Sequence, residues 1–199
     1  MAQAGDAGIR LDGYEVLVAV CGGIAAYKTA TLVSRLVQSG ASVTVAMTRA
    51  ARKFITPLTM EALSGRQVFS SLWTSGEEHD PQHLSLTESA DLFIIAPATA
   101  NIIAKIVHGI ADEVVSTMAL SAASPLLVAP AMNTRMWENP AVQENIATLR
   151  KRGAHIIGPD EGWLACRTVG KGRMSEAEEI FTEAAGLLRK SPPRKKAKP

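Results

Sequence analysis

A strand, a glycine turn and a helix come early in the sequence and limit what the chain can fold into. Tyr14–Cys21 is an almost continuous apolar run, which is typical of a strand buried on both faces of a parallel sheet. Gly22-Gly23 follows, and Ile24–Ser39 then carries apolar residues at helical spacing. Ser42–Met47 is a second apolar strand. Together these segments predict a right-handed βαβ unit.

The rest of the sequence continues this alternation. Further short strands are expected at Asp91–Ala96, Pro125–Val128 and Ala154–Ile157, with another short one at Gln67–Trp73. Helices are expected at Thr48–Phe54, Pro57–Ser64, His83–Ala90 and Pro140–Arg152, and Thr99–His108 and Asp112–Ala123 are expected to form one or two helices around Gly109. A last helix begins at Ser175 with a capping box completed by Glu178. The sequence therefore predicts an α/β fold, a three-layer αβα arrangement with a flavodoxin-like or Rossmann-like parallel sheet.

Composition limits the domain organisation and the partners. The 199 residues, 47% of them hydrophobic, suit one domain at 14–190, with a flexible leader at 1–13 and a disordered basic tail at 191–199. Six of the 21 Lys and Arg lie in the last eleven residues, which leaves a body of 15 basic and 19 acidic residues. Nucleic-acid binding would rest on the tail alone, and we expect none.

Membrane and secretory roles are also not expected. The sequence has no apolar run long enough to span a bilayer, and its first residues lack the basic and apolar regions of a secretory signal. Its two cysteines, Cys21 and Cys166, form no disulfide framework. These features predict a protein of the reducing cytoplasm.

The glycine turn has the features of an anion site. Gly22 and Gly23 stand where a strand meets a helix, so the backbone can approach a phosphate at the positive end of the helix. The motif is not G-x-G-x-x-G, and the second strand ends at Thr48 rather than at an acid that would bind a ribose. A mononucleotide such as FMN therefore fits better than NAD. A tight turn with no ligand is the alternative.

Two later strand ends supply polar residues. Thr99 and Asn101 follow the strand at Asp91–Ala96, where they can bind flavin or phosphate atoms or simply cap a helix. The stretch Ala129–Glu138, APAMNTRMWE, places Asn133 among two Met and a Trp, a single amide suited to hold a small polar group in an apolar pocket. The alternative is a helix start with Asn133 or Thr134 as the N-cap.

Two residues are candidates for proton transfer. His83 lies at the end of a polar loop, although a single His is more often a surface or capping residue. Cys166 lies within Gly158–Met174, a segment with four glycines and no clear period that we expect to be a long loop. Nearby basic side chains would favour its reactivity. No pair of histidines has convincing metal-ligand spacing, so we expect no metal.

Taken in order, five segments resemble the homo-oligomeric flavin-containing cysteine decarboxylase family. They are GGIAAYK at 22–28, HLSL at 83–86, APATAN at 96–101, PAMNTRMW at 130–137 and ACRTVGKGRM at 165–174. Within the family the chain is most similar to the enzymes that act on 4′-phosphopantothenoylcysteine.

The resemblance implies FMN-dependent decarboxylation of that substrate to 4′-phosphopantetheine in coenzyme A biosynthesis. It implies His83 as the active-site base, Asn133 as the group that orients the substrate carboxylate, and Cys166 as the proton donor, with Met136 also at the substrate. It implies FMN contacts from Gly22, Gly23, Ile24, Thr48, Thr99, Ala100, Asn101, Ile102 and Ala131. It also implies assembly as a homotrimer or dodecamer, with FMN at a subunit interface.

The sequence departs from the family at one position of the cysteine loop. The family usually reads ACG there, whereas this chain has Arg167 in place of the Gly. If the backbone needs positive φ at this position, Arg would be strained. Three other functions remain possible: a peptidyl-cysteine decarboxylase of peptide maturation, a flavin prenyltransferase, and a non-enzymatic FMN-binding regulatory protein.

Overall fold

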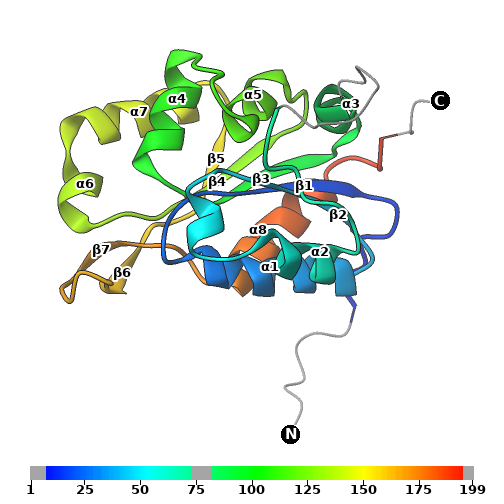
Figure 1. Ribbon diagram of the computed structural model, residues 1–199, viewed down its shortest axis with the longest axis horizontal. Coiled ribbons are helices and arrows are strands. Elements are labelled where there is room, and N and C mark those ends of the chain that lie inside the picture. The colour runs from blue at the N-terminus through cyan, green and yellow to red at the C-terminus, as the bar shows by residue number, and fades with distance from the viewer. Residues whose placement is uncertain (1–7, 73–81, 195–199) are drawn as a thin grey trace, which may run out of the picture.

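A five-stranded parallel sheet forms the centre of the molecule (Figure 1). The computed structural model describes residues 8–72 and 82–194. The sheet has the order β2-β1-β3-β4-β5. Its strands are β1 Glu15–Val20, β2 Ser42–Met47, β3 Leu92–Ala98, β4 Leu126–Pro130 and β5 His155–Ile156. Since β1 lies between β2 and β3, the direction of winding reverses there, which is where open α/β sheets bind ligands.

Helices cover both faces of the sheet and give three layers, as the sequence predicts (Figure 1). One face carries α1 Ala26–Gln38, α2 Pro57–Ser64 and α8 Ala177–Leu188, and the other carries α3 Gln82–Ser89, α4 Ala100–His108, α5 Val114–Ser121 and α7 Pro140–Lys151. Short α6, Thr134–Glu138, precedes α7. Among the described residues, no helix is long and apolar enough to cross a membrane.

Strand β1 shows why an unbroken apolar run is needed. Its alternate side chains Val16 and Val18 join the core beneath α1 and α8, whereas Leu17 and Ala19 join the core beneath α4 and α5. All four are at most 2% exposed. Burial on both faces is therefore confirmed.

Two expected elements are shorter in the structure. The helix expected at Thr48–Phe54 is only the 3₁₀ turn η1 at Ala51–Lys53. The described residues 67–72 of the strand expected at Gln67–Trp73 form one parallel bridge, between Phe69 and Ala46, and Trp73 lies outside the described residues. Both segments lie beside the end of β2, where they close one edge of the sheet.

The segment Gly158–Met174 is not the long loop that the sequence predicts. It contains an antiparallel hairpin, β6 Asp160–Trp163 paired with β7 Val169–Arg173. The two strands are short, rich in glycine and largely exposed, so they lack the apolar alternation by which a strand is recognised.

The start of the last helix also differs from the prediction. Its N-cap is Glu176, one residue later than expected, and Glu179 completes the capping box in place of Glu178. Ser175 is buried instead, and its hydroxyl donates to Asp160 Oδ1 at 3.0 Å. Ser175 therefore ties the hairpin to the start of α8.

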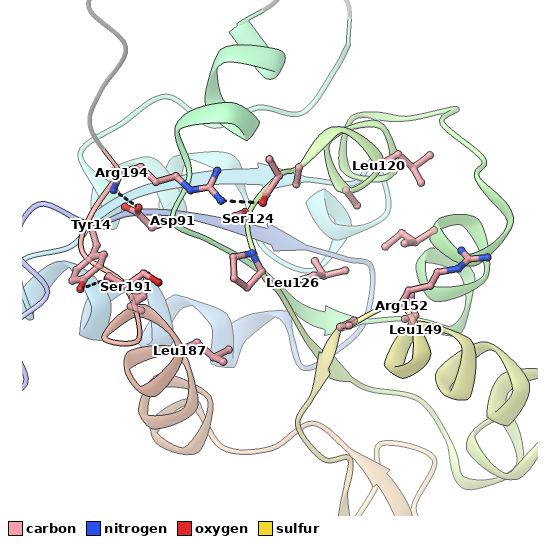
Figure 2. A pocket seen from close by; sticks show the side chains of 18 of the residues that line it. Tyr14, Asp91, Leu120, Ser124, Leu126, Leu149, Arg152, Leu187, Ser191 and Arg194 are labelled. Carbon is pink, nitrogen blue, oxygen red and sulfur yellow. Dashed lines mark hydrogen bonds between the residues drawn. The ribbon is translucent and has the colours of Figure 1, made fainter.

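The packed domain extends beyond 14–190 at both ends. Leu11, from the expected leader, is fully buried. At the other end, Tyr14 donates from its hydroxyl to the Ser191 carbonyl, and the Arg194 backbone N–H donates to Asp91 (Figure 2). These contacts border a cavity of about 650 Å³ at the amino edge of the sheet. Residues 1–7 and 195–199 lie outside the described part of the chain.

Candidate functional site

A cavity of about 800 Å³ lies at the carboxyl edge of the sheet, opposite the cavity of Figure 2. The ends of β1, β3 and β4 and the hairpin β6–β7 all contribute to it. Its lining includes ten of the residues singled out from the sequence, namely Gly22, Gly23, Ile24, Thr99, Ala100, Asn101, Ala131, Asn133, Met136 and Cys166. Segments that are up to 144 residues apart in the chain are thus brought to one place.

The glycine turn forms one end of this cavity. A side chain at Gly22 would collide with the Ala50 side chain and backbone, so this position must be glycine for η1 to pack against it. A Cβ at Gly23 would meet nothing within 4 Å among the described residues, and it would project into open space beside the N-terminus of α1. Gly23 thus leaves room for a ligand group close to backbone.

Thr48 does not line the cavity. It follows β2, and its Oγ1 accepts a hydrogen bond from the N–H of Ala51, the first residue of the 3₁₀ turn, at 3.1 Å. The Thr48 side chain therefore has a local structural role, close in the chain to Ala50, which packs against Gly22.

The N-terminus of α4 forms a second part of the cavity wall. Thr99 is its N-cap and accepts a hydrogen bond from the Ile102 N–H at 3.3 Å. Thr99, Ala100 and Asn101 all line the cavity, but Ile102 is buried in the core and does not. Two helix N-termini, those of α1 and α4, thus border the cavity with their positive ends.

Asn133 both caps a helix and lines the cavity. It is the N-cap of α6, because its Oδ1 accepts a hydrogen bond from the Met136 N–H at 2.9 Å. It also lines the cavity together with Met136, whereas Trp137 is buried in the core as expected of an ordinary core residue. The cap uses the amide oxygen and leaves the Nδ2 group as its hydrogen-bond donor.

The hairpin β6–β7 forms the cavity wall that carries Cys166. Its base is fixed by the Met132 N–H, which donates to the Gly172 carbonyl at 3.0 Å. Gly172 has φ +147°, and a side chain there would collide with the Met132 carbonyl. Trp163, 64% exposed, also lines the cavity from β6. The exposed Cys166 is placed between these anchored strands.

Arg167 has φ 63°, the left-handed conformation that strains a residue with a side chain. It is the one non-glycine residue with positive φ in the described chain. Its N–H donates to the Leu164 carbonyl at 2.9 Å, and the Leu164 N–H donates to the Thr168 carbonyl at 2.8 Å. These bonds close the tip of the hairpin and hold Arg167 in its strained conformation.

A cluster of charges at the cavity was not found from the sequence. Lys28 Nζ lies 2.8 Å from Glu176 Oε1, and Arg173 Nη2 lies 2.6 Å from the same oxygen. The Lys28 hydrogen bond, with smaller effects from both cations, lowers the pKa of Glu176. The buried Arg173 Nε has no hydrogen-bond partner in the described structure. These residues come from three separate elements, and only the fold brings them together.

The other titratable candidates are His83, His79 and Cys21. The backbone of His83 lies in α3, but its side chain falls outside the described residues, as does all of His79. Cys21 is buried, and desolvation raises the pKa of its thiol, so it is a core residue. Among the described residues, no group of three His, Cys, Asp or Glu is placed to hold a metal ion.

Comparison with known proteins decides the family. Residues 8–189 match the model of the flavoprotein family. The chain belongs to this family.

Two bacterial proteins are among the curated relatives of the chain. The chain is 49% identical over 170 residues to the coenzyme A biosynthesis bifunctional protein CoaBC of Vibrio parahaemolyticus, and 46% identical over 170 residues to that of Bacillus subtilis. These alignments cover 85% of this chain but only 43% and 42% of the relatives. The chain thus spans less than half the length of the curated relatives it matches.

Solved structures in the family share the fold over nearly their whole length. The FMN-dependent cysteine decarboxylase SpaF has 30% identity and a TM-score of 0.76, covering 89% of this chain and 96% of its own. A cysteine-to-serine variant of a PPC decarboxylase, complexed with pantothenoylaminoethenethiol, has 29% identity and a TM-score of 0.78, covering 89% and 99%. The parallel-sheet fold is therefore confirmed.

Proposed function

We propose that this flavoprotein decarboxylates 4′-phosphopantothenoylcysteine to 4′-phosphopantetheine with FMN, a step of coenzyme A biosynthesis. The observation that carries the proposal is that Gly23, Asn133 and Cys166 line one cavity. A phosphate cradle, a carboxylate-orienting amide and a proton donor are the three parts that the reaction needs. The CoaBC relatives and the FMN-dependent decarboxylase SpaF support the substrate and the cofactor.

The residues present fit FMN. The open space at Gly23 and the N-termini of α1 and α4 suit a phosphate group. Ile24, Met132 and Trp163 offer apolar surface to a flat ring. Of the other contacts implied by the resemblance, Thr99, Ala100, Asn101 and Ala131 would reach the cofactor directly, whereas Thr48 and Ile102 would act from behind the cavity wall.

FMN, when bound, would accept a hydride from the carbon that bears the thiol and return it at the end of the reaction. The Asn133 Nδ2 group would donate a hydrogen bond to the substrate carboxylate without adding a charge that over-stabilises the ground state. Met136 would exclude water beside it, because its side chain lies at the same part of the cavity. Cys166 would deliver a proton to the product, and His83 would serve as the base.

We further propose that the chain works as a homo-oligomer, a homotrimer or a dodecamer. Four apolar side chains that are 51–71% exposed lie on or next to the packed helices α1 and α2 in the chain: Ile24 before α1, Tyr27 on α1, Phe54 directly after η1 and Leu58 on α2. Ile24 and Tyr27 also line the cavity. An apolar surface continuous with a cofactor cavity is suited to a subunit interface that covers the cofactor. The free cysteines are compatible with a cytoplasmic location.

A peptidyl-cysteine decarboxylase is the second candidate, because the chemistry would be the same and the hairpin β6–β7 would select the substrate. The charge cluster at the cavity favours the phosphorylated substrate. Lys28 and Arg173 share a single carboxylate, that of Glu176, so this wall carries a net positive charge that attracts a phosphate.

The test supplies both substrates to the same preparation. Purified chain is loaded with FMN, its flavin absorbance is recorded, and it is incubated with 4′-phosphopantothenoylcysteine or with a peptide ending in cysteine. We expect CO2 release from the first and little from the second. CO2 release from the peptide alone would favour the peptidyl-cysteine decarboxylase. No CO2 release from either substrate with flavin fully bound would favour the non-enzymatic FMN-binding protein.

A further inference from the structure

A hydrogen bond joins the side chains of Cys166 and Thr168 at the exposed tip of the hairpin β6–β7. Cys166 Sγ lies 3.1 Å from Thr168 Oγ1, and either atom can be the donor. Both residues are exposed at the tip of the hairpin, so neither contributes to a core. Cys166 lines the cavity and Thr168 does not. Thr168 can therefore act on a ligand only through the cysteine.

The backbone at the tip brings these two side chains together. Arg167 stands between them with φ 63°, and the hydrogen bonds of Leu164 to Arg167 and Thr168 close the turn. An exposed Cys side chain has three staggered positions at χ1. The Thr168 hydroxyl thus selects one of these positions for Sγ.

We propose that Thr168 is a positioning residue that donates a hydrogen bond to the Cys166 sulfur, holds the thiol toward the cavity and stabilises the thiolate left after proton transfer. The proposal rests on the proposed function of Cys166 as proton donor. A donated hydrogen bond suits both states of the sulfur. It leaves the thiol proton free for the substrate, and it strengthens once the sulfur is charged.

The proton-transfer step balances as follows. The Cys166 S–H bond breaks, and a C–H bond forms at the carbon that has lost CO2, so that the enethiolate becomes a thioaldehyde. Bound FMN would supply the hydride that reduces the carbon bearing sulfur and gives the thiolate product. The negative charge that moves onto Cys166 lies beside the Thr168 hydroxyl until solvent returns a proton.

The first test needs no substrate. We compare Thr168→Val, which removes the hydroxyl at equal shape, with Thr168→Ser, which keeps it. Thr148→Val on α7 is the matched control, since the Thr148 hydroxyl donates to the Glu144 carbonyl far from the cavity. Iodoacetamide reports on Cys166 alone, because Cys21 is 1% exposed.

We expect alkylation of Cys166 to be about tenfold slower in Thr168→Val, the effect of one lost hydrogen bond to a charged group. Thr168→Ser and Thr148→Val should react like the wild-type chain. Unchanged or faster alkylation in Thr168→Val overturns the proposal, and so does a Thr168→Ser chain as slow as Thr168→Val. Should the Val variant fail to fold, Thr168→Ala takes its place.

The second test uses the holoenzyme and the phosphorylated substrate. In a single turnover, Thr168→Val should release CO2 at the wild-type rate but leave a larger share of product as the oxidised enethiol, with the hydride retained on the flavin, and Thr168→Ser should restore the wild-type ratio. An unchanged product ratio in Thr168→Val overturns the proposal. A wild-type chain that releases no CO2 instead overturns the proposed function, and the alkylation rates then still decide the role of Thr168.

Discussion

The Oδ1 atom of Asn133 accepts a hydrogen bond from the backbone N–H of Met136 at 2.9 Å, while the residue itself lines the cofactor cavity. This contact confirms the helix cap that the sequence offered as one alternative for Asn133. The cap occupies the amide oxygen, so in the proposed function the Nδ2 group is the end of the amide that would meet a substrate carboxylate.

Asn133→Asp separates these two roles. Asp is an equally good N-cap, so α6 and the thermal unfolding midpoint should be preserved. The added negative charge would repel the substrate carboxylate and remove the donor, and we expect CO2 release to fall roughly 100-fold. Asn139→Asp is the matched control, since Asn139 caps α7 by accepting from the Ala141 N–H at 3.0 Å and does not line the cavity. Equal losses in both variants would contradict a substrate role for Asn133.

Gly23→Ala tests the phosphate cradle without using activity. The added methyl group meets no described atom within 4 Å, so the apoprotein should unfold at the wild-type temperature. It would occupy the space assigned to the phosphate, and the purified variant should therefore carry much less flavin. Absorbance after reconstitution with FMN measures the effect. A variant with full flavin content would place the phosphate elsewhere.

Gly172→Ala tests how the hairpin is anchored. The φ of +147° disfavours any side chain, and the methyl group would collide with the Met132 carbonyl. We expect a loss of about 2 kcal/mol or more in the free energy of unfolding, measured in urea. Gly186→Ala is the matched control. Gly186 lies within α8 with open space around it, so that variant should gain about 0.5–1 kcal/mol.

Cys21 should make stability depend on pH in the alkaline range. Its folded pKa is raised by burial, so the folded thiol stays neutral while the unfolded thiol ionises above about pH 8.5. The stabilising contribution is complete below the unfolded pKa and is lost as pH rises toward the folded one. Wild-type stability should therefore fall with pH by up to about 1.4 kcal/mol per unit more steeply than that of Cys21→Ala. The prediction would be refuted if the urea midpoints of the wild-type chain and of Cys21→Ala changed equally between pH 8 and pH 10.

The sequence was sufficient for the sheet because its signals are local. Strand β2 begins and ends where the apolar run Ser42–Met47 predicts, and α2 matches Pro57–Ser64, with Pro at its start and Gly65 as a left-handed C-cap. Parallel strands also meet at one edge, which is why residues after β1, β3 and β4 could be assigned to a common site.

The remainder depended on contacts that no local pattern encodes. The hairpin β6–β7 is held by the Met132–Gly172 hydrogen bond and by Ser175 on Asp160, and it has no apolar period of its own. The charge cluster of Lys28, Arg173 and Glu176 likewise joins three elements distant in sequence. The side chain of Ile102, a residue that the resemblance assigns to the cofactor, is buried in the core and does not line the cavity.

The mass of the product made by Cys166→Ser tests the central claim most directly. Wild-type chain with FMN and 4′-phosphopantothenoylcysteine should yield 4′-phosphopantetheine, the substrate less CO2. In a single turnover the variant should release CO2 at a comparable rate and stop at the oxidised enethiol, lighter than the wild-type product by one H2 because the hydride would stay on the bound flavin. Fully reduced product from Cys166→Ser would contradict the account, because the proton would then come from another group.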